Sequence, residues 1–353
     1  MDARAALSAF LGGLVRPSFA SVIGAIAFAL LELGACLCFV DERAMARLPS
    51  DFFKQDEADD RARITVDACR AHFRASPGVQ VFYLGPSTAR LALRDADHPE
   101  PIERALSEAV GDPVHFWNFT ANGETVEEYL VIAEQLPADA RGVLVVPFSD
   151  TRHDHVEHVD GARKRRTHEL LGLDVTGLGP LAASIGEAPT HTTGVFFLDH
   201  LGFFAARRDA LARLRPPPRV PAELHKHGAT GRFAGIAKRM NDDSSTRALL
   251  ERHVRLMRQV AKEADKRGLE LVILEAPVAP AFNEGKPGLR AAYDEKVAEL
   301  AYATNATYWD LNDEAKLTTE DFYDPVHIGE DDARRRYEAA LVEHLAALIK
   351  SMP

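Results

Sequence analysis

The fold is decided by the stretch VQVFYLGPSTAR, residues 79–90. Its first part, Val79 to Leu84, is a short apolar run of the kind expected of a buried strand. Gly85 and Pro86 interrupt that run, and a helical pattern follows from about Thr88 to Val110. A strand that leads through a tight turn directly into a helix is typical of a parallel α/β sheet.

The same alternation continues towards the C-terminus. Further strands are predicted at Pro113–Phe119, Gly142–Phe148, Leu271–Leu274 and Thr307–Leu311. Further helices are predicted at Asp60–Ala75, Glu124–Leu136, Thr246–Arg267, Leu289–Ala303 and Glu330–Ile349. Apolar strands separated by helices predict a three-layer α/β fold, with a parallel five-stranded sheet covered on both faces. Ligands of such a sheet bind beyond the carboxyl ends of its strands.

The N-terminal part of the chain does not share this pattern. Residues 18–40 form an apolar stretch with a single charge, Glu32, and a transmembrane helix needs roughly 20 such residues. We predict an uncleaved signal anchor at 18–40, after a tail at 1–17 and before an acidic linker at 41–60. A buried helix of the domain is the alternative. The basic residues on either side do not decide the orientation of the anchor.

The remaining residues, 61–353, are assigned to one α/β domain. The alternation stops at about 150–241, which predicts an insertion there. The chain has 42 Lys and Arg against 53 Asp and Glu, a net charge of −11. This charge argues against general nucleic-acid binding, which depends on neutralising phosphates. Three cysteines are too few for a disulfide framework.

Three polar motifs lie where ligands of the sheet are expected. The first contains Ser87, at the turn between the first strand and the helix that follows. A serine there points its hydroxyl over the sheet edge, where the first helical N–H groups can stabilise an oxyanion. The alternative is that Ser87 is only a helix N-cap.

The second motif is Phe-Tyr-Asp-Pro-Val-His, residues 322–327, just before the last predicted helix. His327 can serve as general base to a serine, and Asp324 can hold the required tautomer of the imidazole. The alternative is an Asp-Pro turn with a surface histidine.

The third motif, Asn118 to Thr125, follows the second strand. Its Gly123 lets a backbone N–H approach a reacting carbonyl, or the Asn-Gly pair is simply a turn.

Together, the motifs and their order resemble the SGNH (GDSL-like) hydrolase and acyltransferase superfamily. Gly85-Pro86-Ser87 resembles its nucleophile block, and Asn118 to Thr125 resembles its Asn-x-Gly-x-x-Gly-x-Thr block. Asp324 and His327 resemble its final Asp-x-x-His. The resemblance implies a flavodoxin-like sheet, a nucleophilic Ser87, a catalytic His327 oriented by Asp324, and no metal or cofactor. It also implies an oxyanion hole made by the N–H groups of Ser87 and Gly123.

The chain departs from the family in one block, Gly-x-Asn-Asp. The third strand ends Pro147-Phe148-Ser149-Asp150, so Ser149 stands where the family has a side-chain amide. Ser149 is therefore a third candidate for the oxyanion hole. Weaker candidates for substrate binding are Arg90, Asn122 and Glu275. Arg90 is equally compatible with an exposed helix position, and Glu275 with a capping carboxylate.

With the predicted anchor, this departure resembles the membrane-anchored branch that includes DltD and the alginate O-acetylation proteins. The resemblance implies a serine esterase or O-acyltransferase that acts on acyl esters of a cell-envelope polysaccharide. Such proteins work outside the bacterial cytoplasmic membrane, often beside a membrane-bound O-acyltransferase. Two alternatives stay open. One is a catalytically impaired accessory subunit that binds glycan or the acyltransferase, and the other is a lipase-like esterase of small or lipid esters.

Overall fold

The computed structural model describes residues 22–31, 69–73, 78–94, 99–120, 124–138, 140–149, 237 and 244–352. These ranges contain an α/β domain and, in a separate unit, a helix at residues 22–31. The predicted tail and linker lie outside the described residues, as does the predicted insertion apart from Ala237.

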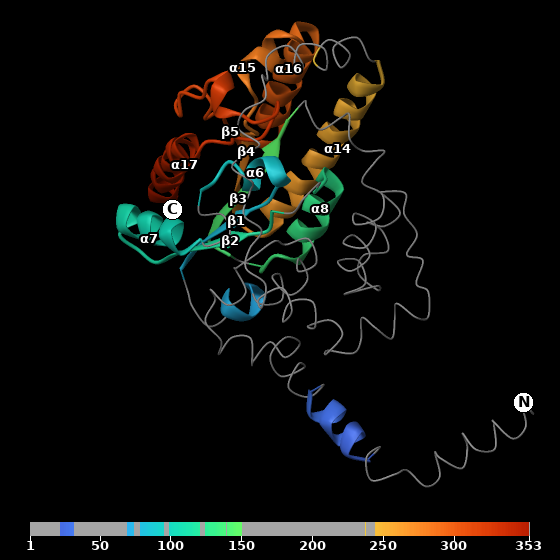
Figure 1. The fold of residues 1–353 in the computed structure, drawn as a ribbon, viewed down its shortest axis with the longest axis vertical. Helices are drawn as coiled ribbons and strands as arrows, with labels where there is room; N and C mark the ends of the chain where they lie inside the picture. Colours follow the sequence, from blue (N-terminus) through green and yellow to red (C-terminus); the bar gives the residue numbers. More distant parts are fainter. Residues whose placement is uncertain are drawn as a thin grey trace, which may run out of the picture. The chain divides into compact units, whose positions relative to one another are not determined.

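Five parallel strands form one sheet in the order β2-β1-β3-β4-β5 (Figure 1). They are β1 Val79–Tyr83, β2 Val114–Asn118, β3 Gly142–Phe148, β4 Leu269–Glu275 and β5 Thr307–Trp309. The predicted five-stranded parallel sheet is therefore confirmed. The strand order changes direction between β1 and β3, which makes the crevice at their carboxyl ends the expected place for a ligand.

Helices cover both faces of the sheet, which forms the middle of three layers (Figure 1). One face carries α7 Glu100–Val110 and α17 Asp331–Ser351. The other carries α8 Val126–Gln135, α14 Ser244–Lys266 and α16 Pro287–Thr304. In the described connections between these elements lie the short helices α6 Ser87–Arg90 and α15 Pro280–Glu284 and the 3₁₀ helix η4 Thr319–Asp321.

The helix predicted from Thr88 to Val110 is wrong as one element. The structure has two helices instead: α6 ends at Arg90, and α7 begins at Glu100. Pro99 caps α7 and Pro101 stands in its first turn. Proline lacks a backbone N–H and is tolerated only at the start of a helix, so these prolines fix where α7 begins.

The core on the α7 and α17 side shows why the strands are largely apolar. Val81 of β1 and Val143 of β3 pack in one cluster with Leu106 of α7 and Leu341 of α17. The intervening strand residues, such as Phe82, are buried as well. Because successive side chains point to opposite faces, helices on both sides favour apolar residues at most strand positions. The buried polar residue Gln80 of β1 accepts a hydrogen bond from the indole N–H of Trp117.

No helix within the described ranges is both long and apolar enough to cross a membrane. Of the predicted anchor, only residues 22–31 are described. The structure therefore does not support the predicted transmembrane helix. The large apolar side chains that this segment exposes are Val22, Ile23, Ile26, Phe28, Leu30 and Leu31.

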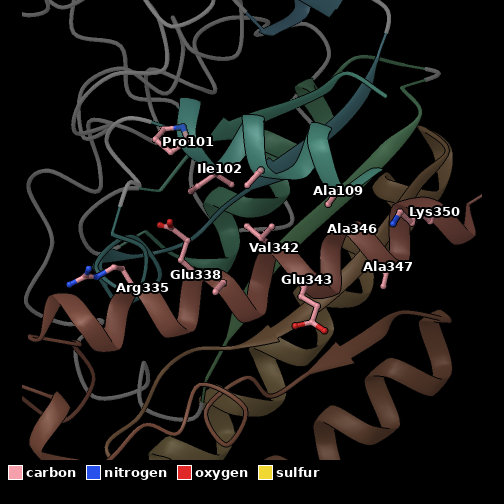
Figure 2. Close-up of a pocket in the computed structure, with 12 residues that line it drawn as sticks. Pro101, Ile102, Ala109, Arg335, Glu338, Val342, Glu343, Ala346, Ala347 and Lys350 are labelled. Atoms are coloured by element: carbon pink, nitrogen blue, oxygen red, sulfur yellow. The ribbon is translucent and has the colours of Figure 1, made fainter. Parts of the chain in front are cut away.

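A groove of about 660 Å³ lies between α7 and α17 (Figure 2). Small apolar residues such as Ala105 and Ala346 line it, together with the charged side chains of Arg335 and Glu343. None of the three predicted catalytic residues lines this groove, so it is separate from the candidate site.

Candidate active site

Ser87 is the first residue of α6, at the carboxyl end of β1. The turn before it requires glycine, because Gly85 has a φ of +148°. A Cβ at this position would lie 2.6 Å from the Cβ of Ala89 and 2.8 Å from the Cγ of Pro147. Pro86 occupies the N-cap position of α6. The alternative interpretation of Ser87 as a helix N-cap is therefore wrong.

Ser87 and the two residues of the C-terminal motif form a continuous hydrogen-bonded chain. The Oγ of Ser87 lies 2.9 Å from the Nε2 of His327, and the Nδ1 of His327 lies 2.7 Å from the Oδ2 of Asp324. An ionised carboxylate can only accept a hydrogen bond, so Nδ1 carries the proton. The unprotonated Nε2 is then free to accept the proton of the serine hydroxyl.

Asp324 is oriented by its own turn. Its Oδ1 accepts hydrogen bonds from the backbone N–H groups of Val326 and His327, both at 2.9 Å. Burial alone would raise the pKa of the Asp324 carboxyl. The hydrogen bonds from the His327 ring and from the two N–H groups outweigh burial, and the pKa lies below its ordinary value. The carboxylate is therefore ionised at neutral pH.

The loop at residues 322–328 holds both groups at the ligand edge of the sheet. It is closed on itself by a hydrogen bond from the N–H of Tyr323 to the carbonyl of His327, at 3.2 Å. It is also joined to the segment that follows β4, because the N–H of Ala279 donates to the carbonyl of Pro325 at 2.9 Å. These bonds place the histidine next to the turn that carries Ser87.

A buried carboxylate that the sequence analysis missed supports the serine turn. Glu124, 2% exposed, accepts a hydrogen bond from the N–H of Gly85 at 2.7 Å. It thereby connects the third motif to the turn of the first. The signal in the sequence is a single acidic residue within the otherwise uncharged stretch Asn118 to Thr125. Two predicted site residues of this stretch, Asn122 and Gly123, lie outside the described residues.

The other predicted site residues lie on strand ends or in α6. Ser149 is buried directly after β3, and Arg90 is the half-buried last residue of α6. Glu275 is buried at the end of β4, where it binds Arg290 and the hydroxyl of Tyr308. Burial raises the pKa of Glu275 in spite of the adjacent guanidinium. Glu275 is thus engaged by an arginine and a tyrosine, and neither contact is the helix cap that was the alternative to a substrate contact.

The assembled groups are a hydroxyl, an imidazole that can accept its proton, and a carboxylate that orients the imidazole. This combination suits nucleophilic attack on an acyl carbonyl. No group of three or more His, Cys, Asp or Glu side chains suited to holding a metal ion occurs in the part of the chain that the structure describes. No protein-family model and no curated protein sequence matches the chain.

Proposed function

We propose that the protein is a serine esterase or O-acyltransferase that works through an acyl-Ser87 intermediate. The observation that carries the proposal is the hydrogen-bonded chain from Ser87 through His327 to Asp324. A serine hydroxyl is a weak nucleophile at neutral pH and needs a positioned base. A subunit that only binds glycan has no use for an ionised carboxylate behind a histidine that faces a serine, so the geometry favours the enzyme over the accessory subunit.

In the proposed acylation, the Oγ of Ser87 attacks the ester carbonyl while the Nε2 of His327 takes the hydroxyl proton. Asp324 stabilises the imidazolium that forms. When the tetrahedral intermediate collapses, the bond to the leaving oxygen breaks and the imidazolium gives its proton to that oxygen. The alcohol departs, and the acyl group remains on Ser87.

The second half repeats these steps with a new nucleophile. A hydroxyl attacks the acyl-Ser87 carbonyl while His327 takes its proton. The bond between the acyl carbon and the Oγ of Ser87 then breaks, Oγ receives the proton from the imidazolium, and the acid or the new ester departs. If the attacking group is water, the enzyme is an esterase, and if it is a sugar hydroxyl, it is an acyltransferase. The arrangement of the three residues serves both reactions equally.

The proposed oxyanion donors are the N–H groups of Ser87 and Gly123, with Ser149 as a third candidate. Ser87 begins a helix, and the first N–H groups of a helix have no intrahelical acceptor. Its N–H is therefore suited to bind the oxyanion. One such donor typically contributes on the order of 10²- to 10³-fold to the rate.

The proposed substrate and location follow from the sequence resemblance. The acyl esters are those of a cell-envelope polysaccharide, and the domain lies outside the bacterial cytoplasmic membrane, anchored through residues 18–40. A membrane-bound O-acyltransferase is the proposed partner. Reporter fusions after Pro353 should then be active in the exported compartment. A cytoplasmic reporter signal, or a mature N-terminus beyond Val40, would contradict the anchor and its orientation.

The catalytic proposal is tested with a fluorophosphonate probe on the full-length chain. We expect mass spectrometry to find the adduct on the peptide that contains Ser87. Ser87→Ala should abolish labelling, whereas Ser351→Ala, at an exposed serine near the end of α17, should be labelled like the wild type. An adduct on a different residue, or no adduct on a folded chain that hydrolyses esters, would refute the assignment.

A further inference from the structure

The ring of Tyr323 lies nearly parallel to the imidazole of His327, in an offset stack. The two ring centroids are 5.4 Å apart, and the ring planes differ by only 6°. Every other pair of rings between described residues is tilted by 23° or more. The most nearly parallel ring pair in the described part of the chain is thus the one that contains the proposed catalytic base.

The backbone of the loop brings the two rings together. Phe322 and Ile328 form an antiparallel bridge, and the next pair inward is joined by the bond from the N–H of Tyr323 to the carbonyl of His327. Residues that face each other across an antiparallel pair project their side chains to the same side. The stack is therefore built into the loop that carries the histidine.

The stack limits movement of the His327 imidazole out of its own plane, which the two hydrogen bonds do not prevent. The N–H and the lone pair of an imidazole lie in the ring plane, so the bonds to Asp324 and Ser87 fix the direction of the two nitrogens of His327. During the proposed reaction the bond to the serine hydroxyl is lost, because Oγ becomes acylated. A flat ring against one face of the imidazole then limits movement out of its plane. The electron-rich face of the phenol ring also favours the imidazolium.

We propose that Tyr323 is a positioning residue for the base, whose ring keeps the Nε2 of His327 directed at Ser87. The inference rests on the proposed function, because it concerns the base of that reaction. Within the described residues the hydroxyl of Tyr323 has no hydrogen-bond partner, so the ring face carries the contact. Burial and the charge of Asp324 raise the pKa of Tyr323 to about 12, so the phenol stays neutral and does not act as a second base.

Two substitutions separate the ring from the hydroxyl in the full-length chain. Tyr323→Phe keeps the flat face, and Tyr323→Leu replaces it with an aliphatic side chain. With a saturable ester we expect Tyr323→Phe to retain kcat within about threefold. Tyr323→Leu should lose on the order of tenfold in kcat with an unchanged KM, the upper end of what one aromatic pair contributes. Tyr323→Met is measured in parallel, so that the comparison does not depend on the folding of one variant.

A spectroscopic measurement tests the same inference without turnover. The proton between Nδ1 of His327 and the carboxylate of Asp324 should give a downfield proton resonance, identified by its absence in His327→Ala. We expect it in the wild type and in Tyr323→Phe, and we expect it to be broadened or lost in the folded aliphatic variants.

Equal losses in the Phe and Leu variants, an unchanged kcat in the aliphatic variants, or a resonance that survives in them would each overturn the inference. Failure of the proposed function itself would be seen differently, as a wild-type chain in which Ser87 does not react with the probe. The resonance would then still decide whether Tyr323 holds the imidazole.

Discussion

Replacing Asp324 by asparagine tests the orienting role of this residue, because the structure determines how the new amide must sit. Oδ1 of Asp324 accepts two backbone N–H groups at 2.9 Å. An amide nitrogen cannot accept these bonds, so the asparagine oxygen must take this position. The NH₂ group then lies where Oδ2 was, 2.7 Å from the Nδ1 of His327. It donates to Nδ1, which forces the proton of the imidazole onto Nε2.

The wrong tautomer blocks the proposed base, because a protonated Nε2 cannot accept the proton of Ser87. We expect Asp324→Asn to reduce kcat/KM at pH 7 by about 10²- to 10⁴-fold. That range corresponds to about 2.7 to 5.4 kcal/mol of transition-state stabilisation. The loss should be smaller than that of His327→Ala, since a minor fraction of the imidazole can still adopt the productive tautomer.

The assay is ester hydrolysis under conditions in which the wild type reacts with the fluorophosphonate probe. Asp324→Ala is the matched variant, because it removes the carboxylate without supplying a donor to Nδ1. It should be no less active than Asp324→Asn, although it removes more of the side chain. A fully active Asp324→Asn beside an inactive His327→Ala would refute the reasoning, because another group would then have to orient the imidazole.

Three further predictions follow from the geometry. Ser87→Ala and His327→Ala should each remove nearly all esterase activity, and the double variant should be hardly worse, since groups that act as a unit are not additive; additive losses would contradict this. In denaturant unfolding, Gly111→Ala should lower the free energy of unfolding by about 1–2 kcal/mol. Gly111 has a positive φ, but an added Cβ would meet no neighbouring atom, so only the backbone conformation is strained. Gly85→Ala should cost more, about 3 kcal/mol, because its Cβ would also collide with Ala89; equal costs would argue against the tight turn. Finally, the folded-state pKa of Asp324 lies below its ordinary value of 3.8. Ionisation of Asp324 therefore stabilises the fold at pH values above 3.8, and this stabilisation is lost as the pH falls through the folded-state pKa. The stability difference between the wild type and Asp324→Asn, measured by urea unfolding, should therefore shrink between pH 5 and strongly acidic pH, and a difference that grew on acidification would reverse the assigned sign.

The strands could be predicted where both faces of the sheet are buried. The β3 strand, Gly142–Phe148, has no exposed residue and was predicted with its observed bounds. The β4 strand begins at Leu269, before the predicted start, because its exposed residue Glu270 interrupts the apolar run. A polar residue in a pairing position has the same backbone hydrogen bonds as its neighbours, but periodicity cannot recognise it.

The candidate site was predictable only in part, because sequence periodicity locates strands and the motifs after them but not the contacts between loops. Motifs that follow strands can be placed, because parallel strands bring their carboxyl ends to one edge. The bond between Glu124 and Gly85 depends on how two loops meet, and the stack of Tyr323 on His327 depends on how one loop closes on itself. Neither leaves a periodic trace in the sequence.

Each catalytic motif had an ordinary structural alternative, and the geometry weighs against both. Pro86 takes the helix-capping position that would otherwise explain Ser87. The turn at Asp324 is real, but it uses only one carboxylate oxygen, and the other oxygen binds His327. The histidine is not a simple surface residue either, since both of its ring nitrogens are engaged and its side chain is 17% exposed. Neither a helix cap at Ser87 nor an Asp-Pro turn at Asp324 needs a hydrogen bond between Ser87 and His327, which are 240 positions apart in the sequence. A nucleophile and its general base do need this bond.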